Sequence, residues 1–175
     1  MEIWNVVDEN RRDTGQFHSR GDQLTPGDYH VVVEIYTINP DGRLLVTQRD
    51  PVKTSPLSWE FTGGSITRGE TSKEGALREL EEETSLIAAP DELQFLGELK
   101  RETHFLDSYI WKSAEPIKLE SLSLQTGEVC DARLVTLREL DEMNAAGSIV
   151  PTVWKRFELY RKTIEKWAGE QPSNR

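Results

Sequence analysis

Apolar and polar residues alternate along the chain in a pattern that switches repeatedly between strand and helix periodicity. Residues 29–38 (YHVVVEIYTI) and 43–49 (RLLVTQR) are rich in β-branched and aliphatic side chains, and the turn signal NPDG separates them. This pattern predicts two strands joined by a tight turn. Residues 2–20 alternate more weakly and predict a short hairpin at the start of the chain.

The rest of the chain mixes the two periodicities. Further strands are expected at 58–64, 93–105, 107–114 and 130–137. Helices are expected from Ser72 to a point before Pro90, at 137–143 and at 151–167. In the last helix, apolar side chains recur at helical spacing and indicate core contact: Val153, Trp154, Phe157, Tyr160, Ile164 and Trp167. Strands and helices mixed in this way predict an α/β sandwich.

The domain organisation predicted from these elements is simple. A length of 175 residues suggests one domain with enough chain to bury a core. We expect this domain at residues 1–168, with an N-terminal hairpin extension at 1–28 and a C-terminal helix at 151–168. Residues 169–175 are expected to form a flexible tail.

Composition and charge restrict the partners. The net charge of −10 argues against nucleic acid or an anionic membrane as the main partner. An anionic small substrate remains possible, because bound cations can reverse the local field. The single cysteine, Cys130, excludes an internal disulfide and a cysteine-based zinc site. We see neither a signal peptide nor a transmembrane stretch, and therefore expect the cytoplasm.

The acidic helix carries the candidate chemistry. Thr71 and Glu74 have the spacing of a capping box, which predicts a helix start near Ser72. On a helical wheel, Ala76, Leu77, Leu80 and Thr84 share one face, and Glu79, Glu82 and Glu83 share an adjoining arc. Oxygen-only clusters of this kind suit Mg²⁺ or Mn²⁺. Taken alone, however, a glutamate-rich helix face is usually just a solvated surface.

The spacing of these residues is more specific than their composition. From Gly64 the chain follows the pattern G-x5-E-x7-R-E-U-x-E-E-x-G-U, in which U is a bulky aliphatic residue, at eight of nine defined positions. The chain therefore resembles the Nudix box. Ser85 departs from the motif glycine, which puts the helix exit in question rather than the metal chemistry. The resemblance implies a Nudix α/β/α sandwich, with a mixed β-sheet between helices.

The resemblance also implies roles for individual residues. Glu79, Glu82 and Glu83 would bind Mg²⁺ (or Mn²⁺), with one of them helping to deprotonate a water, and the main-chain carbonyl of Gly63 would be a further ligand. Arg78 and Glu70 would form an ion pair that ties the loop to the helix. A later loop often supplies another carboxylate, for which Glu128 is the candidate and Asp107 a weaker one. Glu128 could equally be a charge at the end of a turn.

The implied activity is divalent-metal-dependent hydrolysis of a diphosphate bond in a nucleoside diphosphate linked to another moiety. A Nudix fold that senses a nucleotide without cleaving it is the alternative. Residues 2–140 also resemble the branch related to isopentenyl-diphosphate isomerase. That enzyme has a Cys-Gly-His sequence where this chain reads Gly63-Gly64-Ser65, and one metal-binding histidine of that family matches His30. Isomerase activity is therefore the less favoured reading.

Substrate contacts are predicted less sharply. Arg49 and Lys53 match positions where isomerase-like proteins contact the substrate diphosphate, although both could be solvated charges at a strand end. Four aromatic residues could stack on a base, but aromatic residues in strands are usually core: Tyr36, Trp59, Phe61 and Phe105. A nucleotide is the leading substrate class, and either a monomer or a homodimer is compatible with the sequence.

Overall fold

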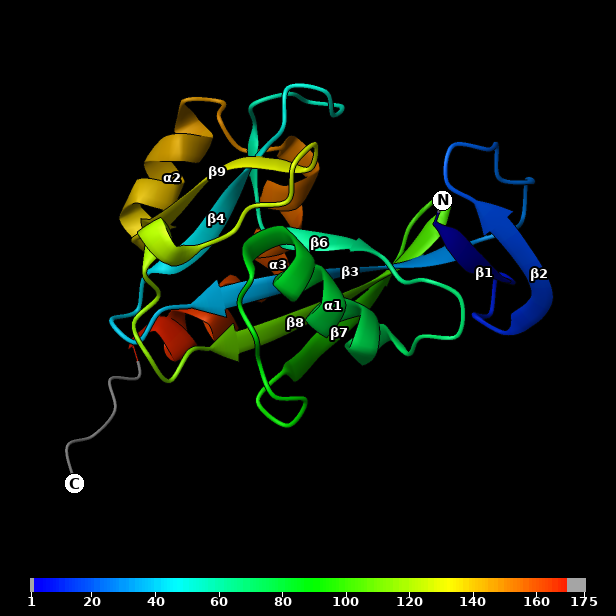
Figure 1. Cartoon of the computed structure of the whole chain (residues 1–175), viewed down its shortest axis with the longest axis horizontal. Helices are drawn as coiled ribbons and strands as arrows, with labels where there is room; N and C mark the ends of the chain where they lie inside the picture. Colours follow the sequence, from blue (N-terminus) through cyan, green and yellow to red (C-terminus); the bar gives the residue numbers. More distant parts are fainter. Residues whose placement is uncertain (1, 170–175) are drawn as a thin grey trace.

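The computed structural model describes residues 2–169 and is built around a mixed β-sheet with helices on both faces (Figure 1). The sheet has the order β5-β4-β3-β8-β7, with β6 pairing β3 and β9 pairing β4. Strands β3 and β8 are parallel and the other pairs of this sheet are antiparallel. The predicted α/β/α sandwich with a mixed sheet is confirmed.

The strands and helices of the main body have the following bounds: β3 His30–Ile38, β4 Leu44–Arg49, β5 Trp59–Glu60, β6 Thr62–Ser65, α1 Ser72–Thr84, β7 Gln94–Lys100, β8 His104–Lys112, η1 Leu119–Ser121, β9 Val129–Val135, α2 Leu137–Ala145 and α3 Pro151–Gly169. A separate two-stranded sheet is formed by β1 Ile3–Val7 and β2 Asp13–Ser19. Gly169 is the last helical residue of α3, and the rest of the predicted tail, 170–175, lies outside the described residues.

Alternation along β3 explains the two layers of the core. Val33 and Ile35 point to one face and pack against Ala76 and Leu80 of α1. Tyr36 and other residues of the opposite face pack against α3, whose buried positions are Val153, Phe157 and Ile164. The predicted apolar stripe of the last helix is therefore core. The four aromatic residues considered for base stacking are also core: Tyr36, Trp59, Phe61 and Phe105.

Two predicted boundaries differ from the structure, whereas the predicted end of α1 before Pro90 is confirmed. Residues 58–64 form two strands, because β5 pairs with β4 while β6 pairs with β3. The chain turns between β7 and β8 at residues 101–103, so His104 and Phe105 belong to β8 and not to the preceding strand. Helix α1 stops at Thr84, well before Pro90, because Ser85 adopts a left-handed conformation.

The hairpin of β1 and β2 is docked onto the main body by specific contacts. Val7 forms an isolated antiparallel bridge with Tyr29, with N–O distances of 2.8 and 2.9 Å. Arg11, in the turn of the hairpin, donates to Glu98 and, over 2.6 Å, to the buried Asp107. These contacts fix the hairpin beside one end of β3 (Figure 1). Among residues 2–169, no helix has both the length and the apolar character needed to cross a bilayer.

Candidate active site

The glutamates of α1 are held by a well-formed helix. Thr71 and Glu74 form the predicted capping box, in which each side chain bonds the backbone N–H of the other residue. Ala76 and Leu80 are completely buried against the sheet, so the rotation of the helix about its axis is fixed. As a result, Glu83 lies on the buried side, Glu79 at its margin and Glu82 at the surface.

Next to this helix lies a polar cavity of about 180 Å³. Its walls come from the hairpin, β6, α1 and the loops that precede β5 and β9. The residues that line it are Glu2, Trp4, Arg20, Lys53, Gly63, Gly64, Ser65, Glu79, Glu82, Glu83, Gln125 and Glu128. Six of the predicted metal- or substrate-binding residues therefore meet here: Gly63, Glu79, Glu82, Glu83, Glu128 and Lys53.

Glu83 is the most unusual member of this group. Its side chain is buried at 3% exposure, and its Oε2 accepts one hydrogen bond, from the Gly63 N–H at 3.3 Å. Within the described chain, no lysine or arginine forms an ion pair with it. Burial raises the pKa of Glu83 well above its ordinary value, and the neighbouring carboxylates of Glu60 and Glu79 raise it further.

Arg78 organises the other two glutamates. Its Nη1 donates to Glu79 Oε1 and to Glu82 Oε2, each at 2.9 Å. Burial nevertheless raises the pKa of Glu79 to about 7, against the opposing effect of Arg78. No three histidine, cysteine, aspartate or glutamate side chains within residues 2–169 are close enough to hold a metal as they stand. The glutamates are gathered around a guanidinium rather than converged on a common point.

The predicted ion pair between Arg78 and Glu70 is present. Arg78 donates from Nε to Glu70 Oε1 at 2.7 Å and from Nη2 to Glu70 Oε2 at 3.0 Å, a bidentate contact. Arg78 Nη2 also donates to the Ser65 carbonyl, and Glu70 accepts the Thr67 N–H at 2.7 Å. These bonds tie the loop after β6 to α1 and orient the guanidinium that holds Glu79 and Glu82.

Two glycines allow the backbone of β6 to approach its neighbours closely. A Cβ on Gly63 would lie 2.2 Å from the Val33 carbonyl oxygen, and one on Gly64 would lie 2.4 Å from Glu79 Oε1. Any other residue would push β6 away from β3 or Glu79 out of its position. The glycines therefore permit both the strand pairing and the close carboxylate.

Opposite the helix, Glu128 is neutralised by two cations. Lys53 Nζ lies 2.5 Å from Glu128 Oε2, and Arg20 Nη2 lies 2.8 Å from Glu128 Oε1. Burial acts to raise the pKa of Glu128, but the hydrogen bonds and charges of Lys53 and Arg20 together outweigh it and lower that pKa. The cavity thus has an acidic wall on α1 and two basic side chains across from it.

The other predicted residues lie elsewhere. Arg49 donates to Glu60 Oε2 at 2.7 Å and to the Thr54 carbonyl at 2.6 Å, and it does not line the cavity. Asp107 is paired with Arg11. His30 packs edge-on against Trp4, and its Nδ1 is buried without a hydrogen-bond partner in the described chain. Cys130 is exposed on β9.

Sequence reasoning gave no binding role to six residues that line the cavity: Glu2, Trp4, Arg20, Gly64, Ser65 and Gln125. The first three belong to the hairpin segment, and their place at the cavity depends on contacts between parts of the chain far apart in sequence. Arg11 and Asp107, for example, are 96 positions apart. No local pattern signals such a contact, although the charge of Arg20 is the kind of feature a diphosphate site needs.

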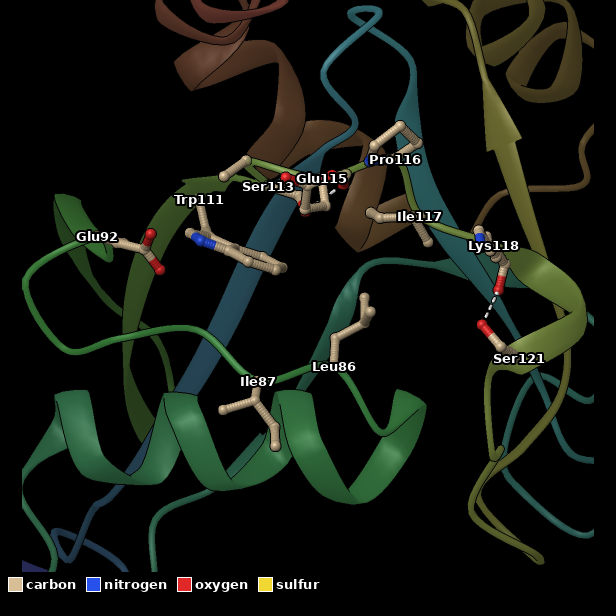
Figure 2. Close-up of a pocket in the computed structure, with 11 residues that line it drawn as sticks. Leu86, Ile87, Glu92, Trp111, Ser113, Glu115, Pro116, Ile117, Lys118 and Ser121 are labelled. Atoms are coloured by element: carbon tan, nitrogen blue, oxygen red, sulfur yellow. Dashed lines mark hydrogen bonds between the residues drawn. The ribbon is translucent and has the colours of Figure 1, made fainter.

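A second cavity, of about 320 Å³, lies between the end of α1 and residues 113–121 (Figure 2). Leu86, Ile87 and Trp111 form part of its apolar lining. None of the predicted site residues lines this cavity.

Comparisons with known proteins identify the family. A model of the NUDIX domain matches residues 28–153. A Nudix hydrolase of Listeria monocytogenes is 35% identical over 156 residues, which cover 86% of this chain and 89% of that protein. The chain belongs to the Nudix family, and its enzyme class is that of the Nudix hydrolases.

Solved structures show the same fold at low sequence identity. One from Deinococcus radiodurans has a TM-score of 0.68 at 20% identity and covers 85% of this chain and 92% of its own. A bifunctional NMN adenylyltransferase/ADP ribose pyrophosphatase from Francisella tularensis, complexed with AMP and a manganese ion, has a TM-score of 0.62 at 16% identity. That match covers 82% of this chain and 43% of the other.

Proposed function

We propose that the protein hydrolyses a diphosphate bond in a nucleoside diphosphate linked to another moiety, with a divalent metal bound by Glu79, Glu82 and Glu83. The observation that carries this proposal is Glu83, a carboxylate that is almost fully buried and in contact with no cation of the described chain. A buried charge of this kind is costly unless it is paired or coordinates a metal.

The donor set fits Mg²⁺ or Mn²⁺. It consists of carboxylate oxygens together with a main-chain carbonyl from Gly63, and hard divalent cations prefer oxygen ligands. Burial raises the pKa of both Glu79 and Glu83, and neighbouring carboxylates raise each further; a bound cation would offset these effects. Glu128 is proposed as an additional ligand or base from the opposite wall.

When bound, the metal would neutralise diphosphate oxygens and lower the pKa of a coordinated water. The chain's own residues would fix the geometry. The Gly63 N–H orients the Glu83 carboxylate, while Arg78, itself held by Glu70, orients Glu79 and Glu82. To reach a metal beside Glu83, Glu79 and Glu82 would have to turn from Arg78 toward it.

Lys53 and Arg20 are the proposed contacts for substrate phosphates. Both line the cavity, and both are occupied by Glu128. A diphosphate that entered the cavity would compete for these cations and free Glu128 to act on the metal or on water. Arg49 remains a predicted substrate contact, but it would have to leave Glu60 and Thr54 to reach the cavity.

A nucleotide substrate is supported by the Francisella structure, whose described ligands are AMP and a manganese ion. The alternative, a module that binds a nucleotide without cleaving it, would be favoured by loss of a motif glutamate, and every one of them is present. Isomerase activity is less favoured still, because Cys130, the only cysteine, is exposed on β9 and does not line the cavity.

The test is a panel of nucleoside and sugar-linked diphosphates incubated with the purified protein and Mg²⁺ or Mn²⁺. We expect release of phosphate or a monophosphate from at least one of them. Glu82→Gln and Glu83→Gln should lose this activity while remaining folded. Glu81→Gln is the matched control, because Glu81 lies on the same helix but is exposed and does not line the cavity.

Two outcomes would decide against the proposal, the first against hydrolysis and the second against the metal site. A nucleotide that raised the melting temperature with Mg²⁺ but remained intact would support the sensing alternative. Unchanged turnover in both Glu82→Gln and Glu83→Gln would reject the proposed metal site.

A further inference from the structure

Ser85 stands where the Nudix box has glycine, and its backbone has the conformation for which glycine is suited. Its φ of 62° and ψ of 11° place it in the left-handed region, and its N–H bonds the Glu81 carbonyl at 2.7 Å as α1 ends. A non-glycine residue is disfavoured there by contact between its Cβ and the backbone. The serine side chain is therefore the feature to explain.

That side chain makes a contact which glycine could not make. Ser85 Oγ accepts the backbone N–H of Ser123 at 2.9 Å, and it donates to the carbonyl of Thr84. Ser123 is 38 positions further along the chain, in the segment that leads to β9. The hydroxyl thus joins the end of the metal-binding helix to a distant loop.

A short series of contacts connects Ser123 to the cavity. Two residues on, the Gln125 N–H bonds the Glu83 carbonyl at 3.4 Å, and Gln125 lines the cavity. The Gln125 carbonyl then accepts the N–H groups of Glu128 at 3.1 Å and Val129 at 3.0 Å. Glu128 in turn pairs with Lys53 and Arg20. The segment 122–128 therefore carries two cavity residues and is attached to α1 at its first half.

Polar contacts hold this segment in place: its far end is attached through Glu128, which pairs with Lys53 and Arg20 and whose carbonyl accepts the Asp50 N–H at 3.0 Å, and its near end is attached to α1. No residue between Ile117 and Val129 is buried, so core packing does not fix its position. The cavity of Figure 2 separates the stretch just before it from α1: Leu86, which follows Ser85, and Ser121 both line that space. A segment held by hydrogen bonds rather than by burial is sensitive to the loss of one of them.

We propose that Ser85 is a positioning residue whose hydroxyl holds segment 122–128 against α1, so that Gln125 and Glu128 face the diphosphate cavity. This inference rests on the proposed function for the identity of the cavity. It assigns a role to the one position at which the chain departs from the motif, and it links substrate binding to a residue that lines neither the metal site nor the substrate path.

Two variants separate this role from that of ending the helix. Ser85→Gly removes the hydroxyl and also the conformational penalty, whereas Ser85→Ala removes the hydroxyl and keeps the penalty. We expect Ser85→Gly to be at least as stable as the unmodified protein and Ser85→Ala to be less stable. Both should nevertheless exchange the amide hydrogens of Ser123 and Gln125 faster, by roughly two- to tenfold, and raise KM by a similar factor with kcat less affected.

Ser121→Ala is the matched control, because Ser121 immediately precedes segment 122–128 and its hydroxyl bonds only the nearby Lys118 carbonyl. It should leave both amides and KM unchanged. The inference would be overturned if the amides of Ser123 and Gln125 exchanged in Ser85→Gly at the rate of the unmodified protein. It would also be overturned if KM rose only in the less stable variant, Ser85→Ala, and not in Ser85→Gly. Faster amide exchange with an unchanged KM would overturn it as well. If no diphosphate were turned over at all, the proposed function would fail. Exchange at the two amides would still decide whether the hydroxyl holds the segment.

Discussion

Two buried glutamates, on opposite faces of the sheet, differ in the number and kind of partners that the chain gives their carboxylates. Glu34 and Glu83 are each 3% exposed. Glu34, on β3, is directly opposite Gly63 in the pairing with β6, and Gly63 is the residue that bonds Glu83. The two carboxylates therefore belong to the same part of the fold, one on the α3 side and the other on the α1 side.

Glu34 has a complete set of partners. Arg156 of α3 donates to it from Nε at 2.8 Å, the Tyr36 hydroxyl donates at 2.8 Å, and the Ser108 hydroxyl donates at 3.1 Å. Glu83 has a single backbone N–H and faces other carboxylates. Among the described residues, Glu34 therefore has a cation and two hydroxyls as partners, whereas Glu83 has no ion-pair partner; under the proposed function a divalent cation would supply it.

The largest expected effect is on activity. If Glu83 binds the metal as proposed, Glu83→Gln should reduce kcat by at least about a hundredfold, because the variant lacks a carboxylate ligand. The same change should leave the melting temperature equal or higher, because an uncompensated buried charge is lost while the shape is kept. Steady-state kinetics and thermal unfolding check the two parts, with Glu81→Gln as control. A stable variant with full activity would remove the contrast between the two glutamates.

Glu34→Gln should show the opposite profile. It leaves Arg156 without its carboxylate in a mostly buried position, and we expect the free energy of unfolding to fall by about 2–4 kcal/mol. Turnover at a temperature where the variant is folded should stay within about threefold of the unmodified rate, since Glu34 does not line the cavity. Urea unfolding measures the loss. Replacing both partners with leucine should recover part of it, and no recovery would mean that the ion pair is not the source.

The sequence predicts the surroundings of Glu83 much better than those of Glu34. The spacing of Glu79, Glu82 and Glu83 on one arc of a helix follows from helical periodicity, and the capping box fixed where that helix starts. The paired Arg78 and Glu70 followed from the motif as well. Glu34, by contrast, stands in an apolar strand, and its partner Arg156 lies 122 positions away. Long-range pairings of this kind have no local signal.

The same limit explains what was missed around the cavity. Lys53, in the loop after β4, reaches it and pairs with Glu128, whereas Arg49, the last residue of β4, is held by Glu60 and Thr54. The division of residues 58–64 into β5 and β6 depends on which strand each half pairs with, and composition does not encode that choice. The contributions of Trp4 and Arg20 depend on where the hairpin docks.

Stabilisation by Mg²⁺ should also distinguish Glu83 from Glu34. At Mg²⁺ concentrations about a hundred times Kd, the folded protein should gain about 2.7 kcal/mol, and chelation should remove the gain. Glu34→Gln should retain this increment and Glu83→Gln should lose most of it. Melting temperature against Mg²⁺ concentration provides the readout. An increment of equal size in both variants would place the cation elsewhere.

His30 is a third ionisable side chain, and it is only partly buried. Its expected effect on stability is the smallest of those predicted. Burial, with smaller contributions from His104 and His18, lowers the pKa of His30 from 6.5 to about 4, so the ring stays neutral in the folded protein. Between these values the unfolded chain binds more protons, so stability should fall as pH decreases from about 6.5 to 4. After allowance for partial exposure, we expect about 1–2 kcal/mol.

The check is urea unfolding across this pH range for the unmodified protein and for His30→Leu. Subtracting the two curves isolates the contribution of His30 from those of the carboxylates. The difference should be flat above pH 7 and should change between about pH 6.5 and 4. A flat difference throughout would show that His30 titrates alike in both states.

The most direct test of the central claim, that Glu83 is completed by a divalent cation, is anomalous diffraction from crystals soaked in Mn²⁺. We predict an anomalous peak in the cavity beside α1, in contact with Glu83 and the Gly63 carbonyl, with Glu79 and Glu82 turned from Arg78 toward it. A cavity without such a peak at saturating Mn²⁺, with Arg78 still bonded to both glutamates, would contradict the account.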